Sequence, residues 1–74
     1  MKFANIETLI NNFGEITIGK AGSVRCAAIA SDEHQCLAIL ARRPDESLET
    51  LLGRLDFAIA DALEKQIFTD EINR

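Results

Sequence analysis

The sequence predicts a single small α+β domain: a short N-terminal helix, a three-stranded antiparallel β-meander and a long C-terminal amphipathic helix. Apolar residues recur at helical spacing between residues 48 and 67. Strict alternation of polar and apolar residues starts at Glu15, and two further β-compatible runs follow. The chain has 74 residues, 47% of them hydrophobic. At this length a single core is close to the minimum that folds unaided, so we expect a dimer.

Residues 5–13 carry the pattern of a short amphipathic helix. Asn5 can act as the N-cap, and Glu7 in the first turn suits the positive end of a helix. The apolar positions follow the i, i+3, i+4, i+7 spacing and are Ile6, Leu9, Ile10 and Phe13. Gly14 is the residue at which we expect the helix to end.

Three short strands follow this helix. Ile16 and Ile18 alternate with polar neighbours, and residues 19–22 supply turn residues. Residues 24–30 and 35–41 are the next two runs, and residues 31–34 between them predict a four-residue hairpin loop. The simplest arrangement of the three strands is an antiparallel meander.

The four-residue loop predicts a specific register for the second hairpin. It places Ala28 opposite Leu37 and Cys26 opposite Ile39. Both sides of the hairpin are then apolar, which indicates a sheet covered on both faces. In this register Cys26 and Cys36 lie on opposite faces, too far apart for a disulfide, and we expect reduced, buried thiols.

The long helix is the clearest element. Pro44 stops strand pairing, and either Asp45 or Ser47 caps the helix that follows. The predicted core stripe consists of Leu48, Leu51, Leu52, Leu55, Ile59, Ala62, Leu63 and Ile67. Residues 69–74 form a polar tail that we expect to fray.

The opposite side of this helix carries the candidate site. Phe57 lies there with the small residues Gly53 and Ala60 one turn away, and Phe68 is a further apolar member. Two interpretations remain open. The N-terminal helix can pack on this side and complete an intrachain core. Alternatively, the four residues form an interface with a second copy of the chain or with another protein.

The residue types that support catalysis are present without the arrangement that catalysis needs. A thiol nucleophile requires a nearby base, and a structural zinc requires about four ligands. Cys26, Cys36 and the single histidine, His34, satisfy neither requirement in the predicted fold. The acidic pairs 32–33 and 70–71 are best explained as turn formers and solubilising charges. We therefore predict no catalytic residue, no metal and no cofactor.

The charge balance argues against nucleic acid as a partner. Eight Lys and Arg stand against twelve Asp and Glu, a net charge of -4. The basic residues Lys20, Arg25, Arg42 and Arg43 are expected at a solvated sheet edge. No apolar run has the length of a membrane span, and the first residues lack the pattern of a signal peptide. These features predict a cytoplasmic protein that binds neither membranes nor nucleic acid.

Two resemblances bear on function. Residues 37–60, LAILARRPDESLETLLGRLDFAIA, and residues 67–73, IFTDEIN, resemble a family of short proteins encoded by temperate phages and prophages of Gram-negative bacteria. The resemblance implies a non-enzymatic accessory protein that binds a host or defence protein stoichiometrically. The hairpin that leads into Ser47-Leu48-Glu49 is similar to the HicB-type antitoxin domain, which implies an antitoxin or regulatory module as the alternative. The chain lacks the Gly-rich segment that usually precedes the helix in that domain.

Overall fold

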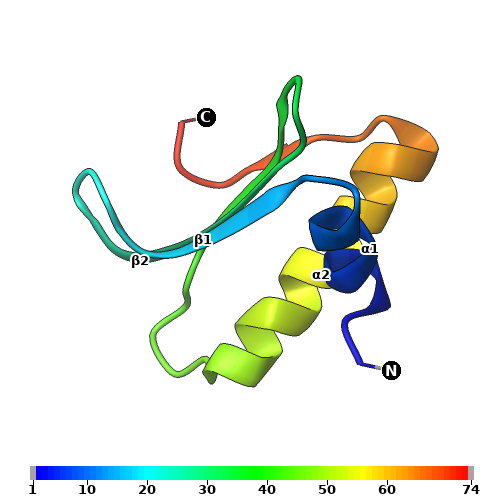
Figure 1. The fold of residues 1–74 in the computed structure, drawn as a ribbon. Helices are drawn as coiled ribbons and strands as arrows, with labels where there is room; N and C mark the ends of the chain where they lie inside the picture. Colours follow the sequence, from blue (N-terminus) through cyan, green and yellow to red (C-terminus); the bar gives the residue numbers. More distant parts are fainter. Residues whose placement is uncertain (1, 74) are drawn as a thin grey trace.

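The computed structural model describes residues 2–73 and confirms the α+β class. Two helices and four strands follow one another along the chain (Figure 1). Their bounds are α1 Ala4–Asn11, β1 Glu15–Ala21, β2 Val24–Ser31, β3 Cys36–Ala41, α2 Leu48–Lys65 and β4 Thr69–Asp70. The predicted helix, meander and long helix are all present in the predicted order. The fourth strand was not predicted.

The four strands form one sheet in the order β1-β2-β3-β4. β1 and β3 each pair antiparallel with β2, whereas β4 runs parallel to β3 and aligns Thr69 with Ala38. The expectation that residues 69–74 fray is therefore wrong for residues 69–71, and residue 74 lies outside the described residues. The backbone N–H of Glu71 donates to the carbonyl of Ile39 over 2.9 Å, and the Glu71 carboxylate accepts the N–H of Ala41 over 3.0 Å. These long-range bonds hold the segment against β3.

Both helices lie on the same face of the sheet (Figure 1). α2 packs on β3 and β2, and α1 packs on α2 and β1. The core between the layers combines Leu9 of α1 and the buried residues of α2 with sheet residues that include Ala28 and Leu40. Thr17, Ile29 and Ile39 belong to the other face by register. Within residues 2–73 no helix covers that face, so the prediction of two covered faces is wrong.

The register of the second hairpin also differs from the prediction. Ala28 lies opposite Leu40, and Ala30 lies opposite Ala38. The cause is a β-bulge: the register shifts between Ala30 and Ser31, where Leu37 is the extra residue on β3. A loop-length argument cannot anticipate a bulge, because the loop itself does not reveal the unpaired residue.

The corrected register changes the reason why the two cysteines stay apart. Cys26 lies at the end of the hairpin where its carbonyl accepts the N–H of Arg42, while Cys36 lies opposite Ser31 at the other end. Five residues of strand separate the two positions, roughly 16 Å. That exceeds the Cα separation of a disulfide. Both thiols are free, and Cys36 is exposed rather than buried.

Helix α1 begins and ends differently from the prediction. Its N-cap is Phe3, not Asn5, and Asn5 lies within the helix. At its C-terminal end the N–H of Phe13 donates to Ile10 and that of Gly14 donates to Leu9, the pattern of a Schellman motif. A Cβ on Gly14 would lie 2.4 Å from Leu9 Cδ1 and 2.9 Å from the Leu9 carbonyl oxygen. Only glycine therefore fits where the chain leaves α1.

Helix α2 confirms Ser47, one of the two predicted caps, because its side chain accepts the N–H of Thr50. The buried residues of α2 are Leu51, Leu55, Ala58, Ile59 and Ala62. The predicted stripe is thus too wide: Leu48, Leu63 and Ile67 are exposed, and Ala58 was missed. The sheet covers only one narrow band of the helix. Ile67 lies beyond the helix, which ends where Gln66 adopts a left-handed conformation.

Candidate protein-binding surface on helix α2

Phe57 remains uncovered by its own chain. Its side chain is 68% exposed, whereas α1 packs against a different side of α2. The Asp56 carboxylate fixes that position, because it accepts the N–H of Ile6 over 2.9 Å and an amide N–H of Asn5 over 3.0 Å. The intrachain interpretation of Phe57 is therefore wrong. Helix α1 packs on the side of α2 that carries Asp56, and Phe57 lies on a different side.

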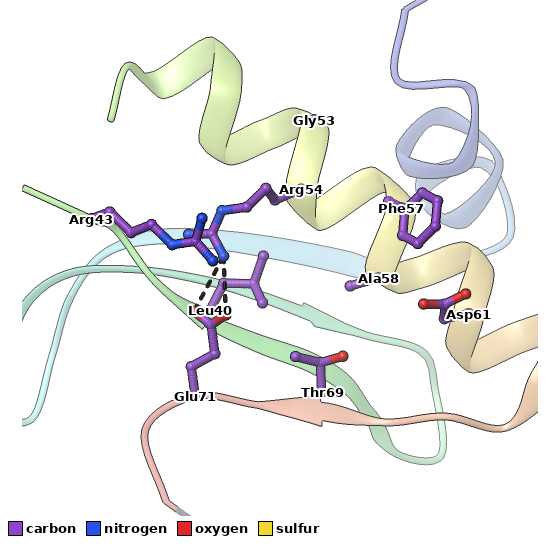
Figure 2. A pocket seen from close by; sticks show the side chains of 9 residues that line it. All are labelled: Leu40, Arg43, Gly53, Arg54, Phe57, Ala58, Asp61, Thr69 and Glu71. Atoms are coloured by element: carbon purple, nitrogen blue, oxygen red, sulfur yellow. Dashed lines mark hydrogen bonds and ion pairs between the residues drawn. The ribbon is translucent and has the colours of Figure 1, made fainter. Parts of the chain in front are cut away.

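Phe57 borders a hollow of about 410 Å³ between α2 and the edge of the sheet. Figure 2 shows Gly53 and Phe57 on the helix side and Thr69 on the opposite side. Leu40 of β3 is buried in the core and forms the apolar base between them. Arg43 contributes a charged group at the rim. The hollow thus joins an exposed aromatic ring, an apolar base and a polar rim.

The four predicted interface residues are only partly brought together. Gly53 and Phe57 both line the hollow, and a Cβ added to Gly53 would meet no atom within 4 Å. Ala60 is half-buried, and neither it nor Phe68 lines the hollow. Phe68 is exposed and directly precedes Thr69, so it lies near the rim. The space beside Gly53 is therefore open, one helical turn from Phe57.

A network around Arg54 forms one wall of the hollow. Arg54 donates from Nε to Glu46 Oε2 over 2.6 Å and from Nη2 to Glu46 Oε1 over 2.8 Å. It also donates from Nη1 to Glu71 Oε2 over 3.0 Å and from Nη2 to the Ala41 carbonyl over 3.0 Å. One guanidinium therefore connects the loop before α2, the end of β3 and the segment after β4.

The sequence pattern did not predict this network, although it contains one signal of it. Arg54 lies three residues after Leu51 and four before Ala58, so helical spacing places it beside the buried stripe. A charged side chain at such a position requires counter-charges and acceptors. Glu71, in a tail expected to fray, could not be recognised as one of them.

The network holds Glu46 in its charged form. Hydrogen bonds from Arg54, together with the backbone N–H of Arg43, lower the pKa of Glu46 from 4.5 to about 2. Reciprocally, the hydrogen bond to Glu46 raises the pKa of Arg54. The Glu46 side chain is only 4% exposed, so water cannot replace these donors. Glu46 therefore stays charged at neutral pH.

This predicts acid sensitivity with a defined pH window. Because folding lowers the pKa of Glu46, its contribution to stability is complete above about pH 4.5 and is lost as the pH falls toward about 2. We expect the free energy of unfolding of Glu46→Gln to be lower at neutral pH and to change less across this window. Urea denaturation followed by circular dichroism from pH 7 to pH 2 measures both effects. Glu64→Gln, at an exposed position on α2, is the control, and an unchanged acid profile in Glu46→Gln would contradict the assignment.

The other polar candidates have structural partners. The Asp32 carboxylate accepts the N–H groups of His34 and Gln35, which lower its pKa and build the turn between β2 and β3. Asp70 accepts the N–H groups of Ile72 and Asn73. In the described part of the chain, no three His, Cys, Asp or Glu side chains are grouped so that they could hold a metal ion.

The basic residues expected at a sheet edge are dispersed. Arg42 donates from Nε to the Glu46 carbonyl in the loop before α2, and Arg43 lines the hollow. Lys20 and Arg25 lie on the β1–β2 hairpin.

Neither helix of residues 2–73 combines the length and the apolar character that crossing a bilayer demands.

No protein-family model, no curated protein and no solved structure matches this chain.

Proposed function

We propose that this chain is a non-enzymatic protein that binds another protein stoichiometrically through the α2 surface around Phe57. One observation carries the proposal: an aromatic side chain that is 68% exposed borders a hollow of about 410 Å³. Exposing a phenylalanine to water is unfavourable, and aromatic residues are enriched at the centres of protein interfaces. The hollow can receive an apolar side chain of the partner while Phe57 packs beside it.

The polar residues around the hollow suit a rim. Arg54 is already neutralised by Glu46 and Glu71, so it stiffens the wall without needing a partner. Arg43 differs, because its backbone N–H donates to Glu46 while its guanidinium attracts Glu46 only through space, without a hydrogen bond among the described residues. A carboxylate of the bound protein is the group that would best complement it. Together, the apolar anchor Phe57 and the cation Arg43 indicate the chemistry of the partner.

The identity of the partner follows from the resemblances rather than from the geometry. The phage-protein resemblance of residues 37–60 favours a host or defence protein as the target. The alternative is an antitoxin-like module of the HicB type, whose partner would be a toxin encoded by an adjacent gene. The first observation in favour of the alternative would be recovery of that gene product on co-expression.

Phe57→Asp is expected to weaken partner binding by about 30-fold or more, the loss typical of an interfacial hot spot. The measurement is affinity capture from host lysate with wild-type and variant baits, followed by titration of the recovered protein. Leu48→Asp is the matched control, since it introduces the same charge at an exposed position of α2 outside the hollow. Equal recovery by wild type and Phe57→Asp would exclude Phe57 as the contact. Recovery of nothing specific by any bait would remove the support for a binding function.

A further inference from the structure

Strand β1 leaves one edge of the sheet unpaired. It is seven residues long and pairs with β2 on one side, and no described residue pairs with its other side. The opposite edge of the sheet is β4, which has only two residues. A long edge strand presents a row of free N–H and C=O groups that can accept another strand. Residues 15–18 carry neither proline nor lysine, the residues that commonly protect such an edge, whereas Lys20 and the register shift between Gly19 and Ala21 protect only the far end of β1.

Two exposed apolar side chains adjoin this edge. Phe13, two residues before β1, is 82% exposed, and Ile18 within β1 is 40% exposed. Phe13 also has a φ of 68°, at the position of the Schellman motif that glycine normally occupies. A phenylalanine there costs backbone strain and exposes its ring, with no compensating contact inside the core. This cost indicates that the ring is used elsewhere.

The sequence of β1 is complementary to itself in an antiparallel arrangement. A second copy aligned about Thr17 places Ile16 opposite Ile18 of that copy and Ile18 opposite its Ile16. Both isoleucines point to the helix-covered face, because they pair with Ala30 and Ala28 of the core.

We propose that two copies of this chain pair antiparallel through their β1 edges, about a two-fold axis at Thr17, and join their four-stranded sheets into one. Such an isologous contact covers the free backbone groups and buries Ile18 and Phe13. It lies at the edge opposite β3 and β4, so the hollow beside Phe57 stays open in the dimer. The proposal is independent of the proposed function.

The first test measures mass in solution by light scattering after size exclusion, over a range of concentrations. Wild type is expected at twice the mass of one chain. Phe13→Gly and Ile18→Lys are each expected to raise the dissociation constant about tenfold or more. Phe13→Gly also keeps the fold, because glycine relieves the positive φ. Phe57→Asp, on the other surface, should leave the mass unchanged.

A monomeric wild type throughout the range would overturn the proposal. So would a dimer that resists Phe13→Gly and Ile18→Lys but dissociates in Phe57→Asp, since the contact would then lie on α2.

The second test fixes the register. Opposed residues of antiparallel strands have Cβ atoms about 5 Å apart, within reach of a disulfide. With Cys36→Ser as the background, Thr17→Cys is expected to form a covalent dimer on mild oxidation. Glu15→Cys is the matched control, because in this register it lies opposite Gly19 of the other copy, four strand positions or roughly 13 Å from position 15 of that copy. Crosslinking of Glu15→Cys in preference to Thr17→Cys would overturn the alignment.

Discussion

Leu55→Ala is expected to lower the free energy of unfolding by about 3 kcal/mol, and the melting temperature by about 15 °C. Leu55 is fully buried in the core between α2 and the sheet. Removing its side chain loses apolar burial and leaves a cavity that neighbouring residues fill only in part. A domain of this length has a total stability of only about 4–11 kcal/mol, so the loss is a large share of it.

Leu63→Ala is the matched control on the same helix. The pattern of the sequence places Leu63 and Leu55 on one stripe, but Leu63 is 52% exposed. Its truncation should therefore change the free energy of unfolding by less than about 1 kcal/mol. Urea denaturation monitored by circular dichroism compares the two variants directly. Equal losses would mean that α2 is rotated relative to the sheet from the orientation described above.

Arg54→Met is expected to lower the free energy of unfolding by about 2 kcal/mol and to release the segment around β4. The variant keeps the aliphatic length but removes the donors to Glu46, Glu71 and Ala41. The two carboxylates then lose their counter-charge. Since β4 contributes only two residues to the sheet, we expect the loss of the Glu71 anchor to open the pairing of β4 before that of the other strands.

Hydrogen exchange distinguishes local release from general destabilisation. The amide of Glu71, which donates to the Ile39 carbonyl, should lose protection in Arg54→Met more strongly than the amides shared by β2 and β3. Arg25→Met removes the same charge at an exposed position of β2 and should leave both sets unchanged. A protected Glu71 amide in Arg54→Met would show that the backbone pairing alone holds β4.

The two apolar surfaces lie far enough apart to serve two different contacts, one with a partner protein and one with a second copy of the chain. The Phe57 hollow lies beside β3 and β4, and the Phe13–Ile18 surface lies beside β1, at opposite edges of one sheet. The Arg54 network shapes the first surface by holding β4 in place. A dimer formed through β1 would present two such hollows, one on each copy.

Much of the architecture was readable from the sequence, because short-range patterns encode local structure directly. The alternation from Glu15 identifies β1, Ser47 marks the start of α2, and Gly14 marks the departure from α1. Phe57 was recognised as a candidate for the same reason, since its place on the helix follows from counting residues. Each of these features depends on groups within about one helical turn or one hairpin.

The tertiary structure decided the features that depend on distant groups. The bulge at Leu37 set the register of the second hairpin, and the band of α2 that meets the sheet determined that Leu55 is buried while Leu63 is exposed. Asp56 placed α1 away from Phe57, and Arg54 drew Glu71 and β4 onto the sheet. The sequence by itself determined which segments become helices and strands. Which faces they bury depends on contacts between residues 17 to 50 positions apart in the chain, and local periodicity carries no information about such contacts.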